Sequence, residues 1–152
     1  ARSDRLARLI RDHAQGVHVH VEPCPGWATR VESLHLDGPE FIAEARARIE
    51  PLLDDGVDRL VLGCTHYAFL APTLEPIVAG RAQLVDVAAA VAHQVVRLAK
   101  VAGQGDARLS LYATARPEHL HGALPRLGLG WLAERAAGAR RIMIPSAPMA
   151  TG

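Results

Sequence analysis

The chain has 152 residues, of which 49% are hydrophobic and 22% charged, so its length and composition are those of one globular domain rather than of a disordered segment. Its 17 Lys and Arg nearly balance its 16 Asp and Glu, and a formal charge of +1 gives no electrostatic basis for binding nucleic acid or a membrane surface. Two cysteines exclude a disulfide-rich scaffold, and no apolar run approaches the ~18–20 residues of a membrane span, so we expect a reduced, cytoplasmic protein.

The first half of the chain predicts two helices separated by a strand. Residues 3–15 place apolar side chains at helical spacing, with Ser3 as the expected N-cap. Residues 17–22 (VHVHVE) alternate with period 2, which predicts a strand. Residues 39–53 predict a second helix, in which Pro51 is expected to cause a kink or a restart. One face of this helix should carry an apolar stripe made of Phe41, Ile42, Ala45 and Ile49.

The second half of the chain predicts strands that alternate with helices. The expected strands cover 58–63, 82–85 and 108–114. The expected helices cover 72–78, 88–101 and 118–135, the last broken at Pro125, Gly128 and Gly130. The strand over 58–63 (DRLVLG) is apolar enough to be buried on both faces, and the tail from Arg140 is expected to be loose.

This alternation predicts βαβ units and a parallel sheet, that is, an α/β fold. Ligands of open parallel sheets bind outside the carboxyl ends of the strands, and three polar stretches follow predicted strands here. The first is Pro-Cys-Pro-Gly-Trp at 23–27, which leads to Glu32. The second is Cys-Thr-His-Tyr at 64–67, and the third begins at Asp86.

Cys64 is the sharpest candidate for chemistry. It follows a predicted strand and precedes a predicted helix, where backbone N–H groups and the helix dipole favour a thiolate. Thr65 offers a hydroxyl and an N–H to an anionic ligand, and His66 is close enough to supply a proton or a positive charge. The alternatives are that Cys64 is a buried small hydrophobe and that His66 is an ordinary loop histidine.

The second thiol and the other histidines give weaker signals. Cys24 lies between two prolines, which favours structural packing, and Glu32 is either a site acid or a solvated loop acid. His18 and His20 share one face of a predicted strand and could ligate zinc, but no third ligand is near, so we expect no metal site. Core or boundary positions are expected for the aromatic residues Trp27, Phe41 and Trp131.

The run Leu-Gly-Cys-Thr-His-Tyr at 62–67 resembles the second cysteine motif of the glutamate racemases, in the cofactor-independent aspartate/glutamate racemase superfamily. Three further stretches resemble that family in order and spacing. They are Cys24-Pro25 followed by Val31-Glu32, then Gly56-Val57-Asp58, and then Leu111-Tyr112-Ala113-Thr114 followed by Pro117-Glu118.

The resemblance implies interconversion of L- and D-glutamate, supplying D-glutamate for peptidoglycan and thus for cell-wall biogenesis and cell shape, without pyridoxal phosphate or metal. An amino acid α-proton is a very weak acid, so inversion requires a well-placed base on each face of the α-carbon. By the same resemblance, Cys64 is one of the two bases and Thr65 holds the substrate carboxylate. His66 assists proton transfer at Cys64, and Glu32 orients or electrostatically supports His66.

Departures from the family pattern imply that the chain corresponds to a C-terminal half. The family carries its other catalytic cysteine in an Ala-Cys-Asn-Thr-Ala segment that this sequence lacks, and Cys24 matches a different element. Ala68 stands where the family has proline, and Val87 where it has serine. Residues 1–86 are expected to form a three-layer α/β lobe with the Cys-Thr-His motif. Residues 87–152 are expected to form a helix-strand-helix that completes the missing N-terminal lobe.

Two other functions remain open from the sequence. One is an inactive racemase-like remnant that binds a small acid or another protein, and the other is a related aspartate or hydantoin racemase. The expected partner is glutamate, with no nucleic acid and no membrane. The apolar surface left by a missing half also predicts either self-association or binding of a complementing N-terminal half.

Overall fold

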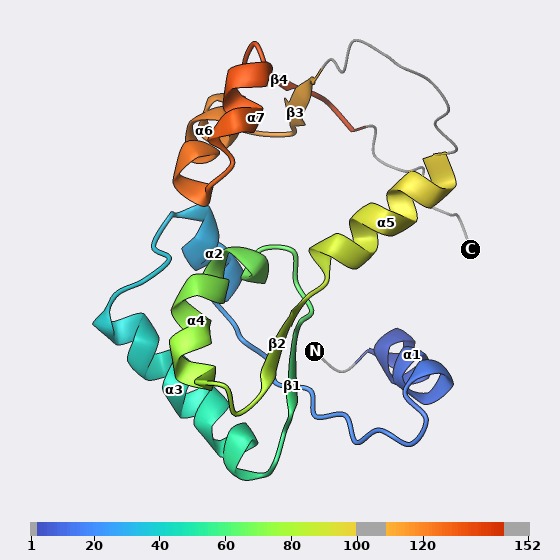
Figure 1. The fold of residues 1–152 in the computed structure, drawn as a ribbon. Coiled ribbons are helices and arrows are strands. Elements are labelled where there is room, and N and C mark those ends of the chain that lie inside the picture. The colour runs from blue at the N-terminus through green and yellow to red at the C-terminus, as the bar shows by residue number, and fades with distance from the viewer. Residues whose placement is uncertain (1–2, 100–108, 145–152) are drawn as a thin grey trace, which may run out of the picture. The chain divides into compact units, whose positions relative to one another are not determined.

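The computed structural model describes residues 3–99 and 109–144, and the chain divides into two compact units, 1–87 and 88–152 (Figure 1). The first unit contains α1 (Asp4–His13), α2 (Trp27–Glu32), α3 (Pro39–Asp54), β1 (Arg59–Leu62), η1 (Tyr67–Leu70), α4 (Ala71–Val78) and β2 (Gln83–Asp86). The second unit contains α5 (Ala88–Ala99), β3 (Leu111–Ala113), α6 (Pro117–Ala123), η2 (Pro125–Leu127), α7 (Gly130–Arg135) and β4 (Ala139–Arg141). Helices and parallel strands of this kind are compatible with an α/β fold.

A βαβ unit organises the first part of the chain. Strands β1 and β2 pair in parallel, with Arg59 opposite Gln83 and Leu62 opposite Asp86 (Figure 1). The connection between them contains η1 and α4, and α4 packs against α3. The hydroxyl of Thr73 on α4 donates to the carbonyl of Leu36 at 2.9 Å, which ties α4 to the segment before α3. The predicted strands over 58–63 and 82–85 and the helix over 72–78 are therefore confirmed.

The core of the first unit is built on one stripe of α3. Phe41, Ala45, Ile49 and Leu53 recur every fourth residue and are all buried, as helical periodicity requires. Ile42, predicted to share this stripe, is instead 36% exposed because it lies one residue away around the helix. The predicted restart at Pro51 is wrong, since α3 runs through this residue to Asp54, and a kink there stays a prediction.

Helix α1 is fixed by local contacts rather than by burial. The hydroxyl of Ser3 accepts a hydrogen bond from the Leu6 N–H at 3.2 Å, so the predicted N-cap is confirmed. Asp4 lies in the first turn and His13 in the last, which complements the helix dipole. None of the α1 residues is buried.

The predicted strand over 17–22 is wrong. These residues form no ladder in the part of the chain that the structure describes, and Val17, Val19 and Val21 are 66%, 40% and 42% exposed. An alternating pattern makes a strand only where a neighbouring strand accepts its hydrogen bonds. The prediction that β1 is buried on both faces is also wrong, because Val61 is 60% exposed while Leu62 is buried.

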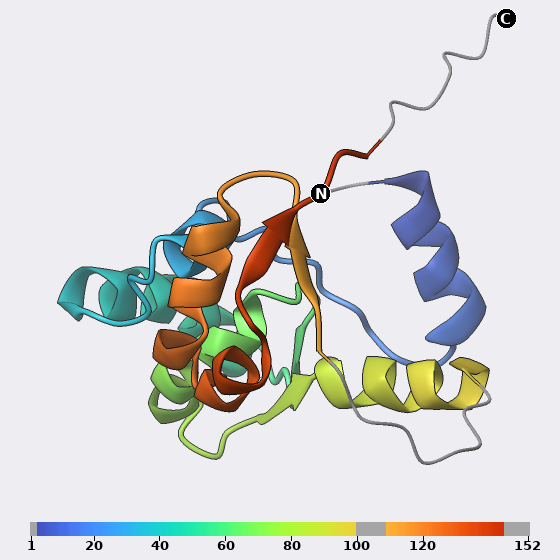
Figure 2. The same cartoon turned by 90° about the horizontal axis from the view of Figure 1, so that it is seen from above.

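The second unit is a smaller parallel arrangement. Strands β3 and β4 pair in parallel and lie side by side in Figure 2, with Leu111 opposite Ala139, and α6 packs against both strands. Residues near Arg140 were expected to be loose, but Arg140 lies in β4 and the Ile142 N–H donates to the Ala113 carbonyl at 2.9 Å. The breaks predicted within 118–135 are confirmed, since α6, η2 and α7 are separate helices. Trp131, predicted to take a core or boundary position, is 56% exposed.

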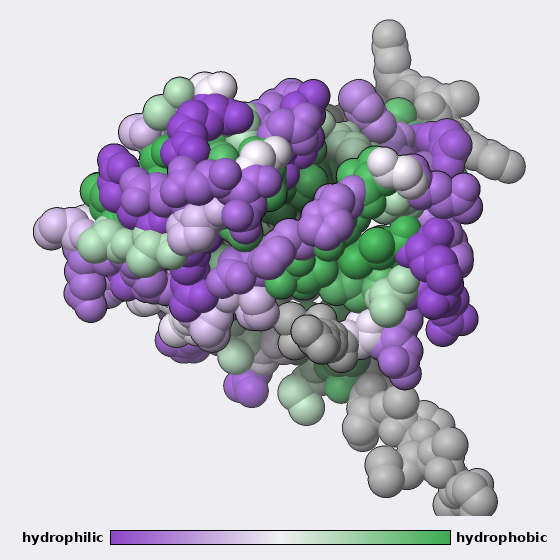
Figure 3. All heavy atoms as spheres, turned by 90° about the horizontal axis from the view of Figure 1, so that it is seen from below, coloured by the Kyte–Doolittle hydropathy of each residue, from purple (hydrophilic) through white to green (hydrophobic). Residues whose placement is uncertain are grey.

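Helix α5 exposes more large apolar side chains than the other described helices. It confirms the helix predicted from residue 88, whose expected end at 101 lies outside the described residues. No α5 side chain is buried, and the exposed apolar residues of this helix are Val91, Val95, Val96 and Leu98. Figure 3 shows hydrophobic residues, in green, at the surface on the face that it displays. No helix among the described residues is long and apolar enough to cross a membrane.

Candidate functional site

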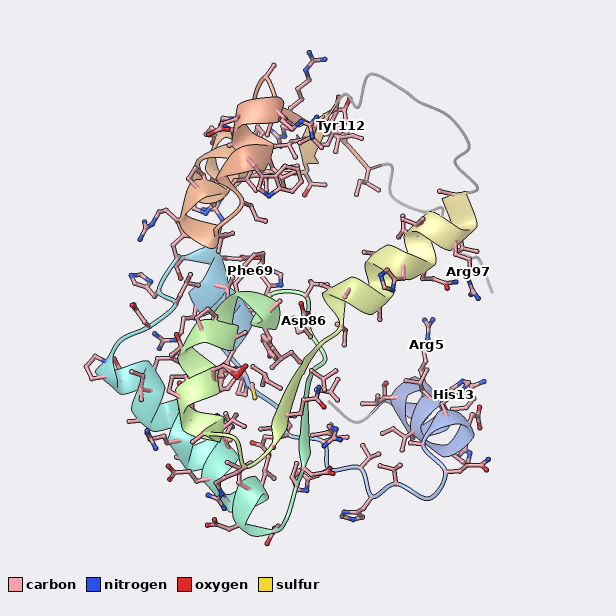
Figure 4. All side chains as sticks on the ribbon, viewed as in Figure 1. Arg5, His13, Phe69, Asp86, Arg97 and Tyr112 are labelled. Carbon is pink, nitrogen blue, oxygen red and sulfur yellow. The ribbon has the colours of Figure 1, made fainter. Side chains whose placement is uncertain are left out.

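The carboxyl ends of β1 and β2 lie at one edge of the sheet. Because Leu62 is opposite Asp86 in the parallel ladder, the chain leaves both strands at the same level. Gly63 and Cys64 continue from β1, and Figure 4 shows Asp86 at the end of β2. This is the edge at which the polar stretches were predicted to meet, and it is where parallel sheets bind ligands.

A tight turn brings Cys64 and His66 together. The Tyr67 N–H donates to the Cys64 carbonyl at 2.9 Å, and the Phe69 N–H donates to the His66 carbonyl at 3.1 Å, so the chain turns directly into η1. The Cys64 Sγ lies 3.8 Å from the Nδ1 of His66. The Cys64 side chain is only partly buried, and Thr65 between the two residues is exposed.

Glu32 reaches the same cluster from a distant segment. Its Oε1 lies 3.3 Å from the Nε2 of His66, so the imidazole stands between the thiol and the carboxylate. The side chains of His66 and Glu32 are 36% and 63% exposed, so solvent and small molecules reach this end of the cluster. The structure thus brings together Cys64, His66 and Glu32, the three side chains singled out from the sequence as catalytic candidates.

Helix α2, which the sequence pattern does not predict, places Glu32. It begins after Gly26, whose φ of 85° is the left-handed conformation that glycine adopts without strain. Trp27 and Val31 of α2 are buried, and α2 contacts η1 directly. The next residue along the helix is Glu32, which therefore emerges at the edge of the core beside His66.

This arrangement suits proton transfer at the thiol. When Nε2 of His66 carries its proton and donates to the Glu32 carboxylate, Nδ1 faces Cys64 as an acceptor. In this geometry the imidazole can accept the thiol proton, and an imidazolium formed in this way would lie between a thiolate and a carboxylate. A thiolate is the form of cysteine that acts as a base or nucleophile.

Cys24 lies in a different environment from Cys64. Burial raises the pKa of the Cys24 thiol above its ordinary value, Arg48 lowers it, and the carboxylates of Glu22 and Glu44 raise it. Its Sγ lies 3.8 Å from the Glu22 carbonyl, to which the thiol donates. A thiol held in its neutral form and bonded to the backbone suits a structural role better than that of a base.

Tyr67 is a contributor to the site that the sequence analysis did not identify. Its hydroxyl donates to the Cys24 carbonyl at 3.0 Å, and its ring meets the edge of Trp27, with centroids 5.5 Å apart. Burial raises the pKa of the Tyr67 hydroxyl, the nearby thiols of Cys24 and Cys64 raise it further, and Arg48 lowers it. Its place directly after His66 is the only sequence signal that could have pointed to it.

An ion-pair network on α3 contacts the other side of the Cys24 segment. The guanidinium of Arg48 donates to the Pro23 carbonyl and to Glu22 Oε1, both at 3.0 Å, and to Glu44 Oε1 at 3.3 Å. The same Glu44 oxygen accepts the indole N–H of Trp27 at 3.1 Å. Glu44 and Arg48 are four residues apart on α3, but nothing in a single sequence pairs them with residues 22–27, which reach them only by packing of that segment on α3.

A surface hollow of about 370 Å³ lies beside α2. Its lining residues are Pro25, Gly26, Thr29, Arg30, Ser33, His35 and Glu44, so it does not include the Cys64 turn itself. Among the described residues, no group of three or more His, Cys, Asp or Glu side chains is placed to hold a metal ion. His121 is partly buried, and its Nε2 lies 3.2 Å from the Ala133 carbonyl.

Comparison with known proteins finds relatives that are named glutamate racemase. The chain is 36% identical over 130 residues to glutamate racemase of Pseudomonas aeruginosa strain UCBPP-PA14, an alignment that covers 83% of the chain and 49% of that protein. It is 42% identical over 100 residues to glutamate racemase of Roseiflexus sp. strain RS-1, covering 66% of the chain and 37% of that protein. With glutamate racemase of Pseudomonas paraeruginosa it shares 34% identity over 141 residues, 90% of the chain and 52% of that protein.

The extent of these matches is as informative as their identity. The chain spans about half the length of the curated relatives it matches, as the sequence analysis anticipated. No family model matches the chain. The resemblance noted at residues 62–67 therefore extends over most of the chain, but over only part of each relative.

Proposed function

Because this chain is homologous to glutamate racemases over about half of their length, we propose that it is the part of a glutamate racemase that carries one of two proton-transferring thiols. The observation that carries the proposal is the continuous contact from Cys64 Sγ to His66 Nδ1 at 3.8 Å and from His66 Nε2 to Glu32 at 3.3 Å. A thiol paired with an imidazole that is oriented by a carboxylate is an activated thiol.

Each residue of the cluster has a defined task in this proposal. The Cys64 thiolate, whose proton has passed to His66, takes the α-proton of bound glutamate and becomes a thiol again. Glu32 holds the imidazole with Nδ1 directed at the thiol. Thr65 is exposed beside Cys64, where its hydroxyl and backbone N–H receive the α-carboxylate of the substrate.

Inversion requires a second acid on the opposite face of the α-carbon. We propose that this group belongs to a complementing N-terminal half, since Cys24 is bonded to backbone and has a raised pKa. The complete enzyme would then act in the cytoplasm without a cofactor and supply D-glutamate for peptidoglycan. Residues 1–86 would form the α/β lobe with the Cys-Thr-His motif, in the three-layer form of the superfamily.

The second unit supports the idea of a complementing half. Helix α5 has no buried side chain and exposes Val91, Val95, Val96 and Leu98, and Trp131 of α7 is 56% exposed. Keeping these apolar side chains in water instead of burying them costs roughly 25 cal/mol of free energy for each Å² of apolar surface. In this proposal residues 87–152 complete the other lobe, and without it the exposed residues promote self-association.

The test is exchange of the α-proton in heavy water, which needs only one thiol. The full chain is incubated separately with L- and D-glutamate, and loss of the α-proton signal is followed by NMR. We expect exchange of one enantiomer without conversion to the other, and loss of that exchange in the Cys64→Ala variant, whereas Cys24→Ala retains it. Absence of exchange with both enantiomers would contradict the proposal and favour a binding module. Exchange that survives Cys64→Ala would contradict the proposed role of this thiol. Parallel incubations with aspartate and hydantoins test the related racemase activities.

A further inference from the structure

The contact between His66 and Glu32 joins two segments that are 34 residues apart in the sequence. Both side chains are substantially exposed, at 36% and 63%. Exposed ion pairs stabilise a fixed geometry by only about 0.2–1 kcal/mol. This ion pair is therefore too weak to hold the segment of Glu32 and the segment of His66 together. The alignment of His66 with Glu32 depends on other contacts between these two segments.

Tyr67 makes such a contact. It is the residue directly after His66, and its hydroxyl donates to the carbonyl of Cys24 at 3.0 Å. The Cys24 carbonyl also accepts the Trp27 N–H at 3.4 Å, in the turn from which α2 and Glu32 follow. One hydrogen bond therefore links the start of the Glu32 helix to the residue beside His66.

The Cys24 turn is held from its other side by α3. Arg48 donates to the Pro23 carbonyl at 3.0 Å, immediately before Cys24. Glu44 accepts the indole N–H of Trp27 at 3.1 Å, three residues after Cys24. Because the chain before and after Cys24 is hydrogen-bonded to α3, the Cys24 carbonyl is held in place. A donor that bonds to this carbonyl is held in place as well.

We propose that Tyr67 is a positioning residue, whose hydrogen bond to the Cys24 carbonyl keeps His66 aligned between Cys64 and Glu32. Tyr67 does not touch the reacting atoms in this role and acts through His66. The inference rests on the proposed function, because it takes the Cys64, His66 and Glu32 contacts as the working unit of the site.

Alkylation of the full chain by iodoacetamide measures this alignment without any racemase activity. The rate at Cys64 is separated from the rate at Cys24 by peptide mass spectrometry, at several pH values. Glu32→Ala is made in the unmodified chain and in the Tyr67→Phe variant, which removes the hydroxyl and keeps the ring that meets Trp27. Tyr112→Phe, at the 54% exposed second tyrosine, is the matched control for the hydroxyl. Glu75→Ala, at an exposed glutamate of α4, is the control for Glu32.

In the unmodified chain we expect Glu32→Ala to slow alkylation of Cys64 about two- to fivefold, because the carboxylate no longer stabilises the imidazolium that forms with the thiolate. In the Tyr67→Phe background the same substitution should change the rate by less than about 1.5-fold, since His66 is already displaced from Glu32. The Tyr112→Phe background should retain the full effect, and Glu75→Ala should have none.

A second pair of variants tests the other end of the contact without altering Tyr67. Arg48→Met releases the Pro23 carbonyl and should reduce the Glu32→Ala effect in the same direction. Arg46→Met is its control, because Arg46 lies on the same helix and its guanidinium pairs with Glu50 one turn further along. Circular dichroism shows whether each variant keeps the helical content of the parent.

The two proposals fail in different ways. If Glu32→Ala slows Cys64 in the unmodified chain and slows it equally in Tyr67→Phe, the positioning role is wrong and the proposed site stands. If Glu32→Ala has no effect in the unmodified chain, the Cys64, His66 and Glu32 contacts do not act as a unit, and both proposals are overturned.

Discussion

The two cysteines of this chain differ in the polar groups beside them. Cys64 lies 3.8 Å from an imidazole nitrogen, whereas the Cys24 thiol donates to a backbone carbonyl and burial raises its pKa. Thiol alkylation proceeds through the thiolate, so its rate follows the thiolate fraction and the access of the reagent. The same residue type therefore meets two different polar environments in this chain.

We predict that iodoacetamide modifies Cys64 several-fold faster than Cys24 at pH 7.5, because desolvation disfavours the thiolate at Cys24. Peptide mass spectrometry at a series of reaction times gives the two rates. Replacing His66 with Gln should slow Cys64 and leave Cys24 unchanged. Equal rates at the two thiols in the parent chain would show that the imidazole does not activate Cys64.

Tyr67 should make stability decrease at alkaline pH. Burial first, and then the nearby Cys24 and Cys64 thiols, raise its pKa, so the folded chain holds the phenol protonated. Above about pH 10 the unfolded chain ionises this group while the folded chain resists, and the stability present below pH 10 is lost as the pH rises through the folded pKa. Cys24, also raised, adds a loss in the same direction that begins near pH 9.

The measurement is urea unfolding at pH 8 and at pH 10.5, followed by fluorescence of the buried Trp27 in a Trp131→Phe background. Tyr67→Phe should lose less stability between the two pH values than its parent, because a phenylalanine cannot ionise. Tyr112→Phe, whose hydroxyl is on an exposed ring, should behave like the parent. An identical pH dependence in Tyr67→Phe and parent would mean that Tyr67 does not contribute.

For single residues, the sequence predicted which side chains of the candidate site lie together better than it predicted the hydrogen bonds that support them. Cys64 and His66 are two residues apart, so one turn is enough to bring them together, and resemblance to a family added Glu32. The hydrogen bond from Tyr67 and the bonds of Arg48 were not predicted, because they depend on three-dimensional packing of segments 25 or more residues apart.

Among the helices and strands, α3 determines where the site residues lie. Its buried Phe41 meets the edge of Trp27 at a centroid distance of 5.3 Å, and the guanidinium of Arg30 lies 4.8 Å above the Phe41 ring. Trp27 and Arg30 both belong to α2, the helix that ends at Glu32. The packing of α2 on α3 is therefore centred on Phe41, and loss of this ring affects both stability and the position of Glu32.

We predict that Phe41→Ala destabilises the first unit by about 3–5 kcal/mol, since it removes a fully buried aromatic ring and leaves a cavity. Ile42→Ala is the matched control on the same helix turn. With 36% of its surface exposed, it should cost clearly less than Phe41→Ala. The midpoint of urea unfolding, followed by Trp27 fluorescence in the Trp131→Phe background, gives the comparison. Equal losses for the two variants would place the packing of α2 elsewhere.

Elements with a strong pattern in their own sequence were predicted, β1 and β2 among them, but the prediction failed where a pattern had no neighbouring strand and where a strand had no pattern. Helix α1 has its cap within three residues, and the α3 stripe repeats every fourth residue, so both follow from local pattern. The strand over 17–22 has the right alternation but no neighbouring strand among the described residues. Strand β4 exists because β3 lies beside it, and its own sequence, Ala-Arg-Arg, carries no strand signal.

On the scale of the whole molecule, the second unit contains most of the unburied apolar surface of the described helices. Val91, Val95 and Leu98 recur at helical spacing along α5, which is the pattern of a helix that packs against something. The chain also covers only about half of the relatives it matches. Exposed apolar patches of this kind mark interaction sites in folded proteins or lead to self-association.

We predict that the chain self-associates when it is alone and that a complementing half reverses this. The probe is the half of the Pseudomonas aeruginosa glutamate racemase that this chain does not match, produced as a separate polypeptide. Sedimentation velocity should show oligomers of the chain alone and a one-to-one complex in the mixture, with less binding of an apolar dye. The complex should racemise glutamate, and it should lose racemisation in the Cys64→Ala variant.

Substitutions on α5 decide whether the apolar stripe is responsible. Val95→Lys, at a residue 58% exposed, should weaken both the self-association and the complex, because a charge in a buried helix interface is costly unless it is paired. Val17→Lys, at a residue 66% exposed in the first unit, adds the same charge outside the α5 stripe and should leave both unchanged. A chain that sediments as a monomer and binds no dye would contradict the prediction, and so would a Val95→Lys variant that associates as strongly as the parent.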